Sequence, residues 1–169
     1  MKRPLHKVER GRRISVRRLG SLLAAALIAL SIAAVRAPIP RGLDGMTICL
    51  PLVGPVTRID TALSGRALQL AAVHERAHAE QCRELGALRS YAARLTVEGK
   101  LRSEAIAFCA EAYWDIATGH RREHVLARIA DELETAYEWT TGLSRGEIVA
   151  AVGRECPPLS TLARAGEAR

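Results

Sequence analysis

The chain has 169 residues, enough for one domain. Its formal net charge of +7 comes entirely from the first 18 residues, where eight Lys or Arg accompany one acidic residue, whereas the rest of the chain has 17 of each sign. A basic surface on the folded domain is therefore not predicted, and we expect no nucleic-acid partner.

An apolar segment follows this basic tail, which is residues 1–18. Residues 19–35 are 17 consecutive positions without a charge, just long enough to span a bilayer as one helix. The positive-inside rule would leave the tail in the cytoplasm and place everything after Arg36 outside. A secretory signal peptide has the same order of parts, with cleavage conceivable after Ala33. We favour an uncleaved anchor, hence a single-pass membrane protein with an extracytoplasmic domain, and expect a secreted protein if the segment is cleaved.

We expect the folded domain at residues 46–156, after a Pro- and Gly-rich linker at 36–45 and before a flexible tail at 157–169. The domain opens with a short extended segment at 46–53, which Pro51 restricts to an edge strand at best. This segment would either pair with an extended substrate or simply pack on the domain. The residues up to 64 are turn-like.

Residues 66–85 predict a helix, because they are rich in Ala and Leu, contain no Pro and stop at Gly86. The helix contains His74-Glu-Arg-Ala-His78, an H-E-x-x-H pattern. Positions i and i+4 share one helix face, so both imidazoles can bind one metal ion. Glu75 would take a proton from a water molecule that the metal activates. The pattern predicts a zinc site for peptide hydrolysis, and an amphipathic helix with two surface histidines is the alternative.

The remaining elements are all predicted as helices, so the fold class is mostly α with a small β element, α+β. We expect a helical piece at 86–95, a break at 98–100, a helix at 104–118 with Ser103 as N-cap, a helix at 120–139, and a last helix that a capping box at Ser144 and Glu147 opens.

Glu104 is the predicted third metal ligand. A catalytic zinc usually has three protein ligands and one open position for water. Glu104 lies 26 residues after His78, and its neighbours along the helix are apolar, so its carboxylate needs a partner. Stabilisation of the helix N-terminus by its charge is the alternative reading. Glu98 and Glu111 are rival ligands.

Four cysteines in an exported domain predict two disulfides, with three possible pairings, among Cys49, Cys82, Cys109 and Cys156. They lack the close paired spacing of a structural zinc site, which disfavours metal ligation. Cys82 lies four residues after His78, so its disulfide would fix the histidine helix to a neighbour. Cys109 is one possible partner.

Residues 57–64, followed by the segment 66–78, resemble the active-site region of the gluzincin metallopeptidases. The likeness is to membrane-associated peptidases of the heat-shock and prenyl-endopeptidase type and to antibiotic-sensor peptidases. These families follow H-E-x-x-H with E-x-x-A-D, in which the glutamate binds zinc. Here Glu104-Ala-Ile-Ala107 matches, but Phe108 replaces the aspartate, which leaves the outer shell of the site open. The resemblance covers about residues 44–140 and implies a minimal gluzincin-like core with Zn²⁺ held by His74, His78 and Glu104, and with Glu75 as catalytic base.

The sequence thus predicts a membrane-anchored, extracytoplasmic zinc-dependent endopeptidase that acts on a peptide or protein substrate. The alternatives are a non-catalytic exported binding module stabilised by metal or disulfides, and an anchored structural protein without metal. The donor that would stabilise the tetrahedral oxyanion is open among His120, Arg121, His124 and Tyr137.

Overall fold

The computed structural model describes residues 42–136 and 143–156, together with scattered positions between 21 and 40. The chain divides into two compact units, Met1–Arg36 and Ala37–Arg169. The predicted basic tail, most of the predicted apolar segment and the predicted C-terminal tail lie outside the described residues. Within the part that is described, no helix combines the length and the apolar character needed to cross a membrane.

The described part of the second unit contains one two-stranded antiparallel sheet and four helices, which confirms the predicted class of a mostly α fold with a small β element. The elements are β1 (Gly45–Leu50), β2 (Gly54–Ile59), α2 (Gly65–Ala93), α3 (Val97–Ala117), α4 (Arg122–Ala136) and α5 (Arg145–Glu155).

The two strands form a hairpin. Its register runs from Gly45 opposite Ile59 to Leu50 opposite Gly54, and the hydroxyls of Thr47 and Thr57 lie 2.9 Å apart across the strands. The predicted extended segment, 46–53, is therefore β1 as far as Leu50, and residues 51–53 form the turn of the hairpin. The prediction that residues 54–64 are turn-like is wrong for 54–59, which form β2, but residues 60–64 form a turn and loop as predicted. Gly54 and the proline after it suggested a turn, yet they begin a β-branched strand, where proline is tolerated.

Helix α2 is broken where the sequence predicts its end. Gly86 has φ 72° and ψ 164°, a backbone conformation that favours glycine, and a short helical piece continues to Ala93. This agrees with a helix that stops at Gly86 and a second piece that follows it.

Helix α3 begins earlier than predicted, and both the break at 98–100 and the Ser103 cap are wrong. Thr96 is the N-cap, and its side chain accepts a hydrogen bond from the backbone of Gly99. A Cβ atom on Gly99 would lie 1.7 Å from the carbonyl oxygen of Ala93. Gly99 therefore allows the start of α3 to approach the end of α2 closely, rather than interrupting the helix.

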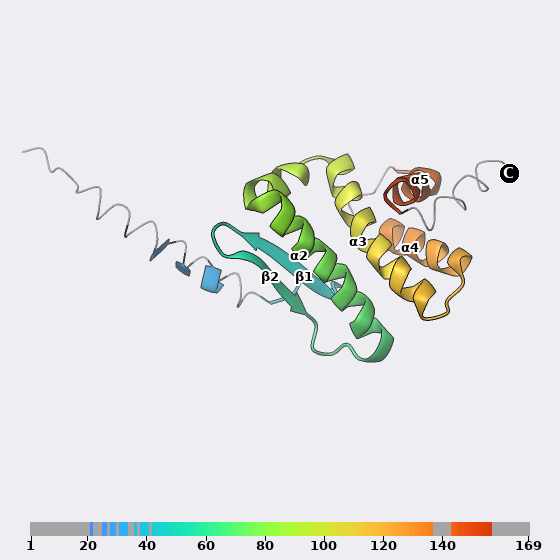
Figure 1. The fold of residues 1–169 in the computed structure, drawn as a ribbon, viewed down its shortest axis with the longest axis horizontal. Coiled ribbons are helices and arrows are strands. Elements are labelled where there is room, and N and C mark those ends of the chain that lie inside the picture. Colours follow the sequence, from blue (N-terminus) through green and yellow to red (C-terminus); the bar gives the residue numbers. More distant parts are fainter. Residues whose placement is uncertain are drawn as a thin grey trace, which may run out of the picture. The chain divides into compact units, whose positions relative to one another are not determined.

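Helix α3 lies between α2 on one side and α4 and α5 on the other, while the hairpin packs against α2 (Figure 1). The predicted capping box of α5 is present at Ser144 and Glu147, and the predicted end of α4 at 139 lies outside the described residues. The hydrophobic core fills the space between α3, α4 and α5, and its largest fully buried apolar side chains are Phe108, Val125, Ile129, Leu133, Ile148 and Val152.

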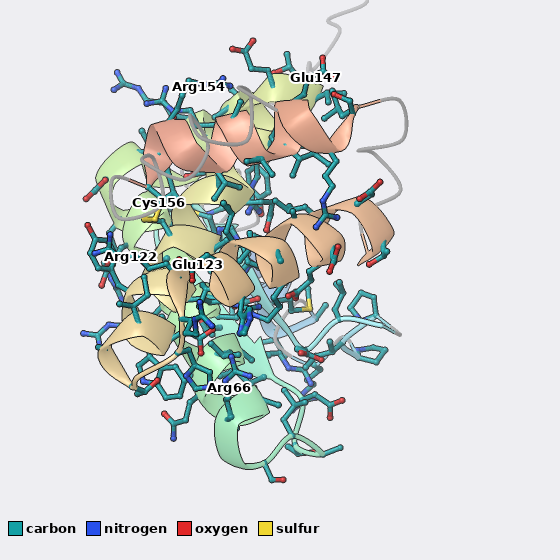
Figure 2. All side chains as sticks on the ribbon, turned by 90° about the vertical axis from the view of Figure 1, so that its right-hand side faces the viewer. Arg66, Arg122, Glu123, Glu147, Arg154 and Cys156 are labelled. Atoms are coloured by element: carbon teal, nitrogen blue, oxygen red, sulfur yellow. A yellow bond between two sulfur atoms is a disulfide. The ribbon has the colours of Figure 1, made fainter. Side chains whose placement is uncertain are left out.

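Both predicted disulfides are present. Cys49 of β1 bonds Cys82 of α2, and Cys109 of α3 bonds Cys156 at the end of α5, so the possible pairing of Cys82 with Cys109 is not formed. Figure 2 shows Cys156 at the end of α5 away from Glu147. The first disulfide fixes the histidine helix to the hairpin, and the second closes α5 over α3.

Candidate metal centre

Two histidines from α2 and one glutamate from α3 bring their side chains to a single point. The Nε2 atoms of His74 and His78 are 3.1 Å apart. Oε2 of Glu104 lies 3.2 Å from Nε2 of His74 and 3.4 Å from Nε2 of His78. All three residues are buried, and together they form a group that could hold a metal ion. The residues that the sequence proposes as ligands are thus in mutual contact.

A second carboxylate supports His74 from the opposite side of its ring. Oε1 of Glu111 lies 2.7 Å from Nδ1 of His74. A carboxylate accepts, so Nδ1 carries a proton. In the neutral ring that a metal would bind, the lone pair is then on Nε2, the atom that faces Glu104. Glu111 follows Glu104 by seven residues, about two helical turns, which places both on one face of α3. Glu111, a rival ligand in the sequence analysis, therefore contacts the far side of the His74 ring instead of joining the group.

Phe108 occupies the position at which the resemblance expects an aspartate. Its side chain is fully buried, and its ring meets the ring of His74 edge to face, with 4.8 Å between centroids. Phe108 therefore packs against the histidine, and the carboxylate that bonds Nδ1 comes from one turn later, at Glu111.

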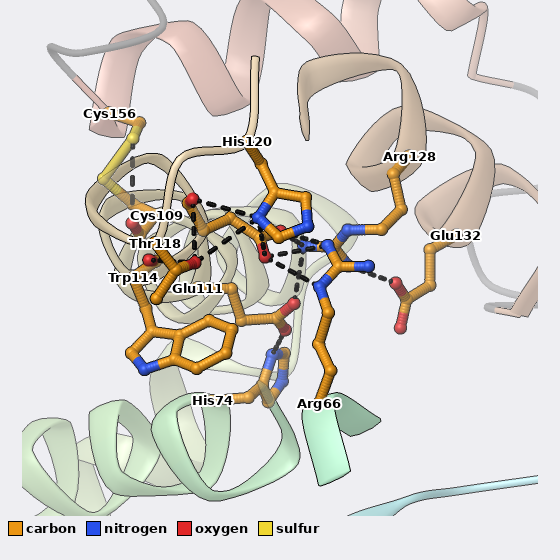
Figure 3. Close-up of polar contacts among 11 residues, drawn as sticks. Arg66, His74, Cys109, Glu111, Trp114, Thr118, His120, Arg128, Glu132 and Cys156 are labelled. Carbon is orange, nitrogen blue, oxygen red and sulfur yellow. Dashed lines mark hydrogen bonds and ion pairs between the residues drawn. A yellow bond between two sulfur atoms is a disulfide. The ribbon is translucent and has the colours of Figure 1, made fainter. Parts of the chain in front are cut away.

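An ion-pair network extends from Glu111 into the domain (Figure 3). Nη2 of Arg128, from α4, lies 2.8 Å from Oε2 of Glu111 and 3.3 Å from Oδ2 of Asp115. Asp115 is fully buried and also accepts two hydrogen bonds from Nη2 of Arg66, at 2.7 and 2.9 Å. Three helices thus hold the carboxylate that holds His74, and such outer contacts orient metal ligands.

The electrostatics of the group favour a positive charge. Burial alone would lower the pKa of His74, but hydrogen bonds and charges from Glu104 and Glu111 outweigh it and raise that pKa. Burial likewise would raise the pKa of Glu104, but its contacts with His74 and His78 lower it. The two carboxylates therefore stabilise the protonated form of His74.

Glu75, the predicted catalytic base, is buried next to the strand β1. Its backbone carbonyl accepts a hydrogen bond from Oγ1 of Thr47 at 3.1 Å. A Cβ atom on Gly45 would lie 2.7 Å from Cγ of Glu75, so the glutamate occupies the space that glycine leaves. Oε2 of Glu75 is shielded from solvent and has no hydrogen-bond partner among the described residues. Glu75 belongs neither to the group of His74, His78 and Glu104 nor to the wall of the described cavity.

Arg94, which the sequence analysis did not single out, touches two of the three grouped residues. Its Nη2 atom lies 3.2 Å from Oε1 of Glu104 and 3.1 Å from Nδ1 of His78, and its Nε donates to Oγ of Ser103 at 3.1 Å. Arg94 is the C-cap of α2. Arg94 follows the break of α2 at Gly86, so helical spacing from His78 does not predict this contact.

A cavity of about 550 Å³ lies beside the group, and His78 and Arg94 form part of its wall. The other lining residues come from β1, the later part of α2 and the first turns of α3, and include Thr47, Cys49, Gln81, Cys82, Tyr91, Glu98, Ser103 and Ile106. Glu98, the other rival ligand, is therefore a cavity residue. Of the three grouped residues, His78 is the one that lines this cavity.

The predicted oxyanion donors lie elsewhere or outside the described residues. Nδ1 of His120 lies 3.3 Å from the backbone oxygen of Asp115, on the far side of Glu111 from His74 (Figure 3). Arg121 and His124 are exposed, and Tyr137 is not among the described residues.

Compared with known protein families, curated proteins and solved structures, the chain matches none of them.

Proposed function

We propose that this chain is a membrane-anchored, extracytoplasmic zinc-dependent endopeptidase with a gluzincin-like site. The observation that carries the proposal is the convergence of His74, His78 and Glu104, with His74 held by Glu111. Two imidazoles and one carboxylate are a ligand set that catalytic zinc sites use.

The spacing of the donor atoms supports zinc. Two ligands of a tetrahedral zinc at 2.0–2.1 Å are about 3.3 Å apart. The three pairs among His74, His78 and Glu104 are separated by 3.1, 3.2 and 3.4 Å. Calcium and magnesium prefer oxygen ligands, so two imidazole nitrogens argue against them. His74, His78 and Glu104 would hold the zinc ion.

When bound, zinc supplies a Lewis acid that polarises a carbonyl group and lowers the pKa of a water molecule toward ~7. Glu75 would accept the proton of the attacking water and deliver it to the nitrogen of the leaving amine. The place of Glu75 in the H-E-x-x-H pattern, directly after His74 on the same helix, supports this role. The network behind Glu111 keeps His74 in the tautomer that presents Nε2.

A peptide or protein is the proposed substrate. The cavity beside His78 is large enough for a side chain, and Thr47 and Cys49 of β1 line it. An extended chain could therefore lie along β1 with one side chain in the cavity, which is recognition by strand addition.

The proposed location outside the cytoplasm has two supports. The chain forms two disulfides, which persist in oxidising compartments. The uncharged segment at 19–35 follows eight basic residues, an order typical of an anchor. The basic tail would face the cytoplasm and the domain the opposite side.

A non-catalytic, exported metal-binding module is the second candidate. The burial of His74, His78 and Glu104 favours it, because structural metal sites are closed to solvent. The two candidates differ in whether the carboxylate of Glu75 is needed.

The test uses the purified full-length chain, loaded with zinc and with its disulfides intact. We expect one zinc per chain by elemental analysis and cleavage of an unfolded protein that a chelator abolishes. Glu75→Gln should keep the zinc and lose at least about 100-fold in kcat, because the base is gone. Glu80→Gln is the matched control, since its carboxylate is exposed on the same helix and pairs with Arg76. If the wild type binds zinc but cleaves nothing, the metal-binding module is the candidate that remains. Equal activity in Glu75→Gln would reject the mechanism. A chain that binds no zinc would reject both candidates.

A further inference from the structure

Arg94 stands at the border between the metal centre and the cavity. The cavity wall includes both Arg94 and His78, and about a third of the Arg94 side chain, 35%, is exposed. The residue caps the end of α2, so its side chain reaches the group from the cavity side rather than from the protein core. A ligand in the cavity next to His78 would therefore lie near the guanidinium.

The sign of the charge is the informative feature. A guanidinium about 3 Å from the donor atoms of a cation site repels the cation that the site attracts. Its hydrogen bond to Glu104 also competes for a carboxylate that a metal would use. The positive charge of Arg94 therefore does not suit a metal ligand. It suits a residue that binds an anion beside the metal.

The tautomer of His78 adds a second argument. A histidine that binds a metal through Nε2 carries its proton on Nδ1, and an N–H group cannot accept a hydrogen bond. Arg94 is a donor only, and its Nη2 lies 3.1 Å from Nδ1 and 3.4 Å from Nε2 of His78, so both contacts would have to be given up when a metal binds through Nε2. The contact with Oε1 of Glu104 and the bond from Nε to Ser103 are compatible with it. One N–H direction of Arg94 would then be free for a ligand at the cavity edge.

We propose that Arg94 donates a hydrogen bond to the anionic oxygen that forms on the scissile carbonyl during peptide hydrolysis. This inference rests on the proposed endopeptidase function and assigns the oxyanion donor that the sequence left open. Preorganised cationic donors of this kind stabilise charge as it develops. Arg94 would replace His120, Arg121 and His124 as the candidate for this role.

The atoms balance as follows. The water oxygen bonds to the carbonyl carbon, one of its protons moves to Glu75, and the carbonyl π electrons move to the oxygen that Arg94 contacts. The electrons then return to re-form the carbonyl as the C–N bond breaks, and Glu75 passes its proton to the amine nitrogen. The second water proton stays on the new carboxyl group and is lost to solvent. Arg94 keeps its proton throughout.

The test compares Arg94→Ala and Arg94→Lys with the wild type in the zinc-loaded full chain. For Arg94→Ala we expect kcat to fall about 100-fold with little change in KM, as for loss of one oxyanion donor. The dissociation constant for zinc should be unchanged or tighter, because a neighbouring positive charge is removed. Low concentrations of guanidinium chloride should restore part of the kcat, and Arg94→Lys should be intermediate. Binding of a peptide phosphonate, a tetrahedral anion, should weaken in parallel when measured calorimetrically.

Arg76→Ala is the matched control, because Arg76 lies between the two histidines in sequence but its side chain is 80% exposed and pairs with Glu80. Thermal unfolding of each variant separates a loss of fold from a loss of the donor. If Arg94→Ala weakens zinc binding about tenfold or more and excess zinc restores its kcat, Arg94 only positions Glu104 and the inference is wrong. Unchanged kcat and phosphonate binding would also overturn it while leaving the endopeptidase intact. A wild-type chain that cleaves nothing would reject the proposed function, and this inference with it.

Discussion

Glu111 lies behind His74 and adds a fourth side chain to the candidate metal centre, next to the two histidines and Glu104. Its two oxygens have different partners, Nδ1 of His74 at 2.7 Å and Nη2 of Arg128 at 2.8 Å. The arginine holds the carboxylate in place, and the carboxylate fixes the imidazole. At the scale of single residues, the geometry of the ligands therefore depends on a residue that would not touch the metal.

Replacement of Glu111 by Gln should weaken zinc binding without removing any of the three proposed ligands. The amide is neutral, so the ion pair with Arg128 is lost, although Arg128 keeps its pairs with Asp115 and Glu132. The His74 ring then loses its charged partner. We expect the zinc dissociation constant to rise about 10–100-fold, the usual effect of losing such a contact. Competition with a chromophoric chelator measures this. Glu123→Gln, which changes an exposed carboxylate, should have no effect, and an unchanged constant for Glu111→Gln would refute the role.

Replacement of Gly45 by Ala tests the placement of Glu75. The added methyl group would lie 2.7 Å from Cγ of Glu75 and 3.1 Å from the carbonyl oxygen of Arg58, so the glutamate must swing away. We expect zinc to stay bound while kcat falls at least about tenfold, since a misplaced general base loses much of its contribution. Gly146→Ala is the control, because its new methyl would meet nothing closer than 3.9 Å. Full activity in Gly45→Ala would show that this position of Glu75 does not matter for catalysis.

At the scale of the elements, the approach of α3 to the end of α2 decides where Glu104 lies. The N-cap Thr96 follows the end of α2 by only a few residues, and Gly99 fits against the carbonyl of Ala93. The chain therefore turns back directly, which brings Glu104 opposite His74 and His78 within the second turn or so of α3.

Gly99→Ala should reverse the usual sign of this substitution. Alanine in a helix is normally more stable than glycine by about 0.5–1 kcal/mol. Here the Cβ atom would lie 1.7 Å from the carbonyl oxygen of Ala93, so α3 must shift, and overpacking of this kind costs about 1–3 kcal/mol. Urea unfolding at equilibrium would measure the free energy of unfolding. Gly146→Ala in α5 should be neutral or stabilising, and a stabilised Gly99→Ala would contradict the close packing of the two helices.

The same elements show what local sequence could predict. Helical spacing alone predicts that His74 and His78 lie on one face of α2, because both residues belong to the same helix. The capping box of Ser144 and Glu147 likewise predicts the start of α5 from residues close in sequence. Local sequence does not predict β2 or the start of α3, because glycine at 54 and 99 is typical of turns and helix breaks. Their actual roles depend on the segments that pack against them. Arg94 and Glu111 were missed in their roles because the contacts that define them cross from one helix to another.

At the scale of the whole domain, the two disulfides tie opposite ends of the fold to the site helices. Cys49–Cys82 joins β1 to α2, and Cys109–Cys156 joins α3 to the end of α5, across sequence separations of 33 and 47. Loops of these lengths correspond to about 4 kcal/mol of stabilisation each, by restriction of the unfolded chain. The two disulfides should therefore stabilise the folded chain by similar amounts but differ in their effect on function.

Pairwise replacement by alanine separates these effects. Either double variant, at positions 49 and 82 or at positions 109 and 156, should lose about 4 kcal/mol of unfolding free energy, measured with denaturant. Only the first should alter kcat/KM at a temperature where both variants are folded, because Cys49 and Cys82 line the cavity beside His78. An equal effect of both on cleavage would mean that the cavity is not where the substrate binds.

The most direct measurement is a crystal structure of the zinc-loaded full-length chain, with anomalous scattering recorded at the zinc edge. We predict one strong peak about 2.0–2.2 Å from Nε2 of His74, Nε2 of His78 and Oε2 of Glu104. A peak elsewhere, no peak, or a Glu104 carboxylate that stays out of bonding distance while no other side chain replaces it would contradict the proposed metal centre.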